Sequence, residues 1–436
     1  MSATSSQIWP AATQQMLPLR SSAALSSPKL TPQIKGPRYR YYAGFSVDFV
    51  RDFLDSHDVG PATVILDPWN GSGTTTLVAS QKQIRSIGVD LNPVMALIAK
   101  GRLADRRSQE RLDDILTDFQ TRAPKNPRSK TGDPLTQWFD GPTSGRIREL
   151  LRRASPAFHD RLGAIDHITA VEAHVVTGLF IVVRSILAER QIGTNPTWVK
   201  APKGTERISV HWRELVSKLV STLDSMPVSG DPIVGESEFV VGSTMSLPKL
   251  SATPNFVLTS PPYCTRIDYA VATRPELAVL GMSLSEQDVL RRAMLGTTTV
   301  PKTIALSPSS IGNTAATALA MVSEHPSKAS RGYYWKWLSQ YFIGYAESMR
   351  RISQAMNGGT LGLVVQDSYY KDIHIDLPKI TIELAELCGW SHVETTEFFV
   401  PKTMAAMNTR SRTYRSGYSA VEAVLTFTRQ SGKWSA

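Results

Sequence analysis

The sequence predicts an α/β fold with an open, mainly parallel sheet, a terminal antiparallel hairpin and a mainly helical insertion. Three observations support this prediction. Short apolar, β-branched runs alternate with helical patterns between residues 47 and 103, and again after residue 236. Residues 104 to 229 carry long helical periodicity, many Arg and Lys, and few strand signals. The final segments read strand, helix, strand, turn and strand, an order that closes a sheet with a hairpin.

These changes of pattern divide the chain into segments. Residues 1–36 contain no acidic residue and are rich in Ser, Ala, Thr, Gln and Pro, so we expect a disordered basic tail. An organelle transit peptide is the alternative for this composition. Residues 37–103 and 236–436 are expected to form the sheet domain, and residues 104–235 the helical insertion.

The composition limits the classes of function. A formal net charge of +10 favours a polyanionic partner. Two cysteines, Cys264 and Cys388, exclude a disulfide framework and a cysteine-based zinc site, and the eight histidines show no metal-ligand spacing. No uninterrupted apolar run approaches the roughly 20 residues that cross a bilayer. We therefore expect a cytoplasmic protein without metal or membrane association; the sequence does not indicate an oligomeric state.

The first predicted elements surround a glycine turn. An amphipathic helix, Val47 to Leu54, follows the aromatic segment Tyr41 to Ser46. A buried strand, Thr63 to Leu66, then leads through Gly71 and Gly73 to a helix that begins at Thr74. Glycines there permit positive φ and let a ligand approach the backbone, while the free amides of a helix start suit a polar ligand group.

The next strand, Ser86 to Val89, ends at Asp90. An acidic residue in this position can accept both hydroxyls of a ribose, as in nucleotide-binding folds generally. The third glycine of the dinucleotide fingerprint is missing, because Thr76 stands there, so NAD is a poorer expectation. A helix from Val94 to Leu103 follows, with a proline near its first turn.

The insertion contains three clear helical patterns, at Ile147 to Leu151, Ile165 to Leu187 and Val210 to Leu223. A loop in it combines Asn195, Trp198 and Lys200, and so could stack on bases and neutralise phosphates. A core-packed tryptophan beside a solvated basic face is the alternative.

The sheet pattern resumes with a strand and turn at Phe239 to Ser243 and a buried strand at Asn255 to Leu258. That strand delivers Thr259 to Tyr263 to the edge where ligands of α/β sheets bind. Residues 264 to 330 start with a helix and pass into a Thr-, Ser- and Ala-rich stretch, expected to be a mobile loop or lid. The remaining predicted elements are a helix at Tyr333 to Met356, a strand at Leu361 to Gln366, a helix at Ile380 to Leu387, and strands at His392 to Phe399 and Val421 to Phe427.

Two motifs together carry a family resemblance. The string from Asp67 to Thr75, DPWNGSGTT, resembles the S-adenosylmethionine loop of DNA amino-methyltransferases, with Trp69 where Phe is usual. Ser260-Pro261-Pro262-Tyr263 resembles their catalytic motif. The resemblance spans roughly residues 38 to 100 and 236 to 430. It implies a Rossmann-like class I methyltransferase sheet, S-adenosyl-L-methionine as cofactor and double-stranded DNA as partner. The implied cofactor-binding residues are Tyr42, Phe45, Ser46, Asp67, Trp69, Asn70, Gly71, Gly73, Thr74, Thr75, Asp90, Leu91, Ser243 and Ser260.

The second motif suits methyl transfer to an exocyclic amine. Such an amine is a poor nucleophile because its lone pair is delocalised into the ring. Ser260 Oγ and the Pro261 carbonyl could accept its hydrogens, Pro262 holds the turn, and Tyr263 offers a flat face for an extruded base. In the family, Ser before Pro-Pro-Tyr goes mostly with cytosine N4, so N4-methylcytosine is the expected product and N6-methyladenine the alternative. The cofactor motif precedes the catalytic motif here, unlike in many cytosine-N4 enzymes.

Residues expected to contact nucleic acid lie in three loops, and the insertion is the expected target-recognition region. They are Asn195, Trp198, Lys200, Arg266, Tyr269, Lys402, Arg410 and Arg412. For the last three, a solvated basic loop is the competing interpretation. An RNA base methyltransferase and a non-catalytic nucleic-acid-binding protein are the rival functions. Restriction-modification, epigenetic marking and phage defence all fit the sequence.

Overall fold

The computed structural model describes the chain in a set of ranges with gaps between them. The ranges are 25–28, 39, 44, 46–57, 59–158, 165–190, 192, 194–195, 198–199, 206–226, 228–230, 232–265, 268–400 and 420–431. Most of the predicted tail, residues 1–36, therefore lies outside the described residues.

A seven-stranded sheet forms the centre of the structure. In sheet order the strands are β10 (Ser391–Val400), β11 (Ala420–Arg429), β7 (Gly359–Gln366), β6 (Phe256–Thr259), β1 (Val64–Asp67), β2 (Arg85–Asp90) and β5 (Ser237–Val241). The five strands from β7 to β5 are parallel, and β11 runs antiparallel to both β7 and β10. The predicted α/β sheet with a terminal antiparallel hairpin is confirmed.

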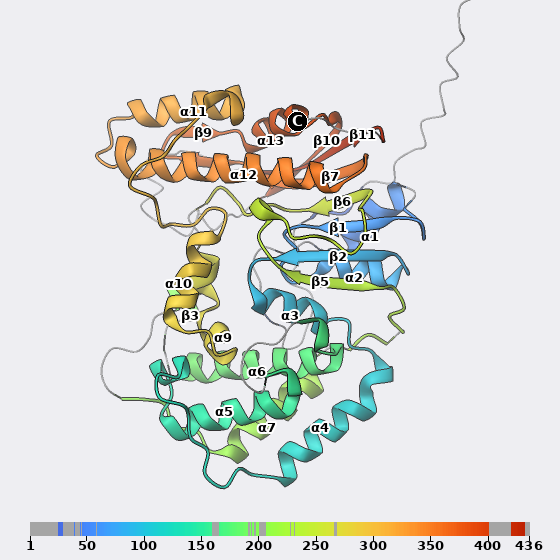
Figure 1. The fold of residues 1–436 in the computed structure, drawn as a ribbon, viewed down its shortest axis with the longest axis vertical. Helices are drawn as coiled ribbons and strands as arrows, with labels where there is room; N and C mark the ends of the chain where they lie inside the picture. The colour runs from blue at the N-terminus through green and yellow to red at the C-terminus, as the bar shows by residue number, and fades with distance from the viewer. Residues whose placement is uncertain are drawn as a thin grey trace, which may run out of the picture.

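Helices cover both faces of this sheet (Figure 1). On one face α1 (Val47–Ser56) and α2 (Thr74–Gln81) bury apolar side chains in a cluster with the strands. On the other, α12 (Trp335–Ala355) and α13 (Leu377–Leu387) do so, and α11 (Asn313–Glu324) packs against these two helices. Neighbouring side chains of β1 point to opposite faces of the sheet. Ile65 packs in the hydrophobic cluster with α1 and α2, and Leu66 in the cluster with α12 and α13.

A helical region lies beyond α3 (Pro93–Gly101), below the sheet as drawn in Figure 1. Its helices are α4 (Gln109–Thr121), α5 (Gly141–Ala154), α6 (Ala170–Glu189) and α7 (Trp212–Ser225). They share one hydrophobic core with α3, and that core also contains Phe239 of β5 and Leu277. By length and composition α6 could cross a membrane, yet 78% of its apolar window is buried inside the protein. Its apolar surface on all sides thus matches a central core helix.

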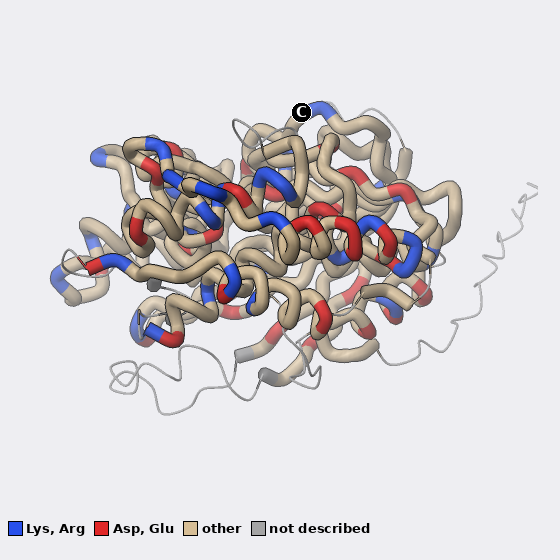
Figure 2. Tube along the Cα trace, turned by 90° about the horizontal axis from the view of Figure 1, so that it is seen from below, with Lys and Arg blue, Asp and Glu red and all other residues tan. Residues whose placement is uncertain are grey.

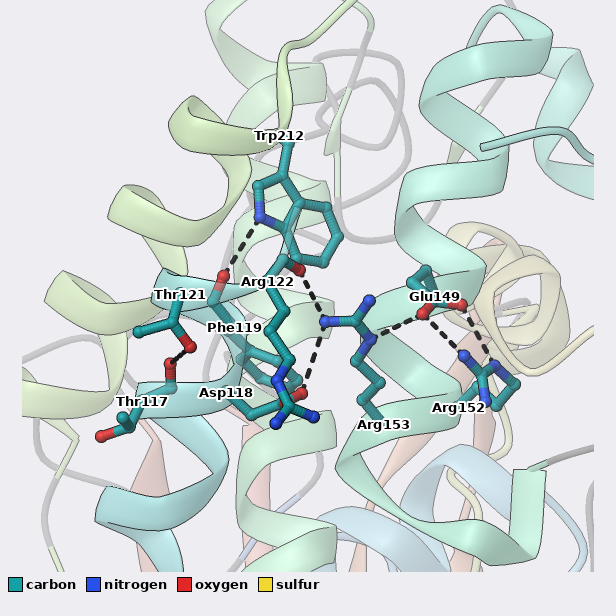
Figure 3. A network of polar contacts seen from close by, with 9 residues as sticks. All are labelled: Thr117, Asp118, Phe119, Thr121, Arg122, Glu149, Arg152, Arg153 and Trp212. Atoms are coloured by element: carbon teal, nitrogen blue, oxygen red, sulfur yellow. Dashed lines mark hydrogen bonds and ion pairs between the residues drawn. The ribbon is translucent and has the colours of Figure 1, made fainter. Parts of the chain in front are cut away.

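Polar contacts join α4, α5 and α7 at one end of this region (Figure 3). The Trp212 indole donates to the Phe119 carbonyl at 3.1 Å. Arg153 donates to the Arg122 carbonyl at 2.6 Å and to Glu149 at 2.6 Å, and its guanidinium lies 5.5 Å from the Trp212 ring centroid. Several cations that made the sequence of this region look basic are therefore committed to contacts within the protein.

The structure differs from the sequence predictions mainly between residues 264 and 330. The stretch expected as a mobile loop contains α11, whose alanines favour helix and which begins after Gly312 at φ 82°. Before it lie α8 (Tyr269–Ala272), α9 (Arg274–Val279) and α10 (Leu284–Ala293). Two short hairpins were also not predicted: β3 (Thr194–Asn195) with β4 (Trp198–Val199), and β8 (Ser368–Tyr370) with β9 (Ile373–Ile375).

Candidate active site

The turn between β1 and α2 is held by the neighbouring strand. Gly71 and Gly73 adopt φ of 49° and 75°, which favour glycine. The backbone amide of Asn70 donates to the Val89 carbonyl at 3.0 Å. A Cβ on Gly73 would lie 2.4 Å from the Cβ of Ala99. Gly73 is therefore needed for the close approach of α3 as well as for the turn.

Asp90 at the end of β2 organises this turn. One carboxylate oxygen accepts from the backbone amide of Gly71 at 2.9 Å, and the other from the backbone amide of Asn92 at 2.8 Å. Burial raises the pKa of Asp90 to about 6, against the opposing effect of these two amides. A carboxylate offers about four acceptor positions, so both oxygens keep capacity for a further donor.

Asp67 links the turn to β6, the strand that leads to Ser260-Pro261-Pro262-Tyr263. It is 2% exposed, and its Oδ1 accepts from Thr259 Oγ1 at 2.6 Å and from the Trp69 amide at 3.2 Å. Burial raises the pKa of Asp67 to about 6. Among the described residues no cationic side chain pairs with Asp67, and a buried carboxylate of this kind is suited to a positively charged ligand group.

Two adjacent cavities lie at the carboxyl ends of the parallel strands, and Trp69 and Ser260 line both. The smaller cavity is lined by Gly44, Asp67, Trp69, Asn70, Ser72, Thr74 and Ser260. The larger is lined by Trp69, Asp90, Leu91, Asn92, Met95, Gly242, Ser243, Thr244, Met245, Ser260, Pro261, Pro262, Tyr263, Tyr269, Ala293, Met294, Leu295 and Ser348.

Three neighbouring elements hold the Ser-Pro-Pro-Tyr segment after β6. Ser260 Oγ donates to the Val364 carbonyl of β7 at 2.9 Å, and the Tyr263 hydroxyl donates to Glu422 of β11 at 3.0 Å. Tyr341 of α12 donates to the Pro262 carbonyl at 2.8 Å. Among the described residues no hydrogen bond to the Pro261 carbonyl is found. The Ser260 oxygen and the Pro261 carbonyl thus remain as acceptors at the cavity.

Tyr269, which the sequence analysis expected on the nucleic-acid surface, lines the larger cavity. Its hydroxyl is buried, and burial raises its pKa to about 12. The described residues provide no hydrogen-bond partner of good geometry for this hydroxyl. Tyr269 thus presents a polar atom beside the place where a cofactor would lie.

The structure brings eight of the expected cofactor-binding residues to the cavities. They are Asp67, Trp69, Asn70, Thr74, Asp90, Leu91, Ser243 and Ser260. Four others do not line them: Gly71 and Gly73 shape the turn, Ser46 Oγ caps α1 through the Phe49 amide at 3.1 Å, and Thr75 Oγ1 donates to the Leu258 carbonyl at 3.4 Å.

The remaining expected residues are only partly placed. Tyr42, Phe45, Lys200, Arg266, Lys402, Arg410 and Arg412 lie outside the described residues. Asn195 and Trp198 are paired backbone positions of the β3–β4 hairpin. Within the described ranges, no group of three or more His, Cys, Asp or Glu side chains is arranged to hold a metal ion.

Several residues of the cavity wall were not predicted from the sequence. Asn92 and Thr244 follow predicted strand ends, so their positions offered a signal. Met294 and Ser348 come from the end of α10 and from α12, and no sequence pattern connects these distant segments to the cavity.

The sequence of this chain is similar to those of several curated methyltransferases. No protein-family model matches the chain. The chain is similar to the type II methyltransferase M.BsoBI of Geobacillus stearothermophilus, with 27% identity over 291 residues, 59% of this chain and 55% of that protein. It is also similar to the type II methyltransferase M.AvaI of Nostoc sp., with 24% identity over 60% of this chain and 58% of that protein. A shorter match, 31% identity over 117 residues, is to the type II methyltransferase M.MjaII of Methanocaldococcus jannaschii, with 27% of this chain and 21% of that protein covered.

The chain spans little more than half the length of the first two relatives. Their names confirm the resemblance to site-specific DNA methyltransferases that the two motifs indicated.

Proposed function

Since its curated relatives are type II methyltransferases, we propose that this chain transfers a methyl group from S-adenosyl-L-methionine to the N4 amine of a cytosine extruded from duplex DNA. The observation that carries the proposal is the position of Ser260 to Tyr263 at cavities that also contain the carboxylates of Asp67 and Asp90. The proposed activity is that of a cytosine-N4-specific, site-specific DNA methyltransferase in the cytoplasm.

The cavities fit the chemistry of this cofactor. S-adenosylmethionine carries a ribose diol, two cationic groups and an adenine ring, and it supplies an activated methyl group when bound. Asp90 would accept the ribose hydroxyls, and the buried Asp67 would favour the cationic end. Ser243 Oγ accepts from the Met245 amide at 3.3 Å, so its hydroxyl hydrogen remains for a ring nitrogen of adenine.

The catalytic segment would activate the target amine by geometry. Ser260 gives its own hydrogen to Val364, so its oxygen can accept one amine hydrogen while the Pro261 carbonyl accepts the other. With both hydrogens held, the amine nitrogen becomes pyramidal and its lone pair points away from the ring. The Tyr263 ring, fixed through Glu422, would stack on the base. The methylated nitrogen is acidic and releases its proton readily, so a strong base is not required.

Adenine N6 is the alternative target, and only the identity of the residue before Pro-Pro-Tyr favours cytosine. The division into a catalytic domain, residues 37–103 and 236–436, and a target-recognition region within residues 104–235 stays a prediction. So do the DNA contacts of Asn195, Trp198, Lys200, Arg266, Tyr269, Lys402, Arg410 and Arg412. Restriction-modification is the biological role that the names of the relatives favour.

Incubation with labelled cofactor and either DNA or RNA, followed by nucleoside mass spectrometry, tests this proposal. N4-methylcytosine in DNA is the expected product; methyl on adenine N6 refutes the cytosine assignment, and methyl in RNA alone refutes DNA as substrate. Ser260→Ala should abolish most turnover and should lower turnover far more than it weakens cofactor binding. Ser225→Ala, which removes an exposed hydroxyl at the end of α7, is the matched control and should leave turnover unchanged.

A further inference from the structure

A short hairpin follows β7 directly and stands outside the central sheet. Its strands, β8 and β9, pair antiparallel with Tyr369 opposite His374 and Tyr370 opposite Ile373. Because successive side chains of a strand point to opposite sides, the hairpin has two different faces. Tyr370, Ile373 and Ile375 are buried, whereas Tyr369 is 39% exposed and the His374 side chain 44% exposed.

The buried face fixes the hairpin to the protein. The Tyr370 ring lies 4.6 Å from the Tyr334 ring centroid, and its hydroxyl lies 2.6 Å from Ser330 Oγ. His325 packs edge-on against Tyr370 at 5.5 Å. β9 also packs against α11 (Figure 1). The hairpin is therefore a rigid support for whatever its outer face contacts.

The outer face carries a preformed aromatic pair. The Tyr369 and His374 rings lie 4.8 Å apart, and His374 Nε2 lies 3.1 Å from Asp367 Oδ2. Held side chains lose little further conformational freedom when they bind a partner. An exposed tyrosine beside an imidazole offers flat surfaces that stack on nucleobases without regard to sequence.

Two contacts place the hairpin beside the catalytic segment. Ser368 of β8 donates to the carbonyl of Cys264, the residue after Tyr263. Gln366, at the end of β7, is paired with Glu422, which holds the Tyr263 hydroxyl. The hairpin thus stands at the same edge of the sheet as the tyrosine on which the extruded base would stack.

We propose that the Tyr369–His374 pair is a nucleobase-stacking platform that contacts the DNA next to the extruded base. The inference rests on the proposed function and names a second contact with the same partner. Extrusion of a base removes the stacking of its neighbours, and an aromatic surface beside the gap replaces part of that stacking. The two acids beside this pair each have an imidazole partner, Asp367 with His374 at 3.1 Å and Asp372 with His325 at 2.9 Å.

Duplex binding by variants of the full chain tests the platform. Modified-base sequencing first locates the methylated sequence; a duplex with that site and a mixed-sequence duplex are then titrated by fluorescence anisotropy. Tyr369→Ala should weaken binding about tenfold, and Tyr369→Phe should bind within about twofold of the wild type because the ring face is kept. Fluorescence of 2-aminopurine next to the target base should be quenched by the wild type and less so by Tyr369→Ala.

Val393→Ala is the matched control. Val393 is 58% exposed on β10, near Ser391, which pairs with Thr428 beside the amino end of β7 and so lies at the opposite edge of the sheet. Melting temperature and cofactor affinity should be unchanged in all three variants. Equal duplex affinity of Tyr369→Ala and Val393→Ala overturns the platform. If the wild type methylates no DNA, the proposed function is refuted. The affinities of the wild type and Tyr369→Ala for the mixed-sequence duplex then still show whether Tyr369 contacts DNA.

Discussion

The carboxyl groups of Asp67 and Asp90 end neighbouring strands, and burial raises the pKa of each to about 6. Each group is held by donors that fix its orientation but carry no positive charge. Such groups destabilise the ligand-free protein when ionised and favour a ligand that brings hydroxyls or positive charge.

Asp67 should make the stability of the ligand-free protein depend on pH. The folded protein keeps a proton on Asp67 up to about pH 6, whereas the unfolded chain releases it near pH 3.8. The folded state therefore binds more protons between these values, and stability falls as the pH rises from about 4 to about 6. At pH 7 the loss is about 3 kcal/mol from this group.

Chemical denaturation of Asp67→Asn between pH 4 and pH 8 measures this effect. The variant should be more stable than the wild type at pH 7 and should bind the cofactor more weakly, because the amide keeps the hydrogen bonds of Thr259 and Trp69 but not the charge. Asp224→Asn, an exposed change at the end of α7, should alter neither property. The opposite result would be a wild-type free energy of unfolding that rises between pH 4 and pH 6 and no longer rises in Asp67→Asn. It would show that Asp67 stabilises the folded protein as it ionises, contrary to this prediction.

Asp90→Ala should weaken cofactor binding by about 2–4 kcal/mol, since two hydrogen bonds to a charged acceptor are lost. The structure adds a second cause: the Gly71 and Asn92 amides lose their acceptor, so the turn loses its support. Isothermal titration calorimetry measures the affinity. Unchanged binding of S-adenosylmethionine would refute the role given to Asp90.

At the scale of elements, α8 and the segment after α10 close one side of the larger cavity, and three side chains tie them together. Asp268 accepts from Arg291 at 2.5 Å and from Thr298 at 3.0 Å, and Arg291 also donates to Thr298 at 2.8 Å. Asp268 precedes Tyr269, and Arg291 lies shortly before Met294, so the cluster positions two parts of the cavity wall.

Arg291→Ala should therefore release this wall and speed cofactor dissociation about tenfold, while the chemical step changes less. Stopped-flow dissociation of the cofactor measures the effect, with single-turnover methylation as the second readout. Arg292→Ala removes the neighbouring exposed cation and should leave dissociation unchanged. Equal dissociation rates in the two variants would show that the cluster has no part in holding the cofactor.

Some helices and strands could be predicted from the sequence and others could not. Strands such as β1 and β6 were predictable because their apolar runs are short and bounded by turn residues. The Asp67 and Ser260 segments could be assigned to one edge because both follow such strands. The helix predicted at Ile147 to Leu151 is the centre of α5, whose start at Gly141 is fixed by the Asp140 cap on the Thr143 backbone amide at 2.7 Å. The alanines of α11 favour helix locally, but its Thr- and Ser-rich surroundings favoured a loop prediction. The β8–β9 hairpin depends on tertiary packing that no local pattern reveals.

At the scale of the whole molecule, the excess of positive charge is not concentrated on the helices. Figure 2 shows basic and acidic residues interspersed along the tube, and several arginines of the helical region pair internally, as Arg148 does with Asp133 at 2.7 Å. DNA contacts of the helical region should therefore depend on a few loop cations. A high pI alone would have suggested a broader basic surface.

Lys200→Ala should weaken binding to every duplex and reduce the slope of log affinity against log salt by about one phosphate contact. Lys218→Ala is the matched control, because Lys218 on α7 is paired with Glu189 at 2.8 Å and should leave the slope unchanged. Salt titrations of duplex binding measure both. Identical slopes in the two variants would show that Lys200 makes no phosphate contact.

The core shared by α3, Phe239 and the helices α4 to α7 has a consequence for engineering. A region with its own core can be exchanged between homologous enzymes like a cassette, and the acceptor enzyme still folds. Here a cut on either side of the helical region would expose α3 and the edge strand β5, so a chimera should misfold rather than acquire a new sequence preference. The DNA contacts proposed for the segment around β3 and β4 are therefore better tested by point substitutions, which leave the shared core intact.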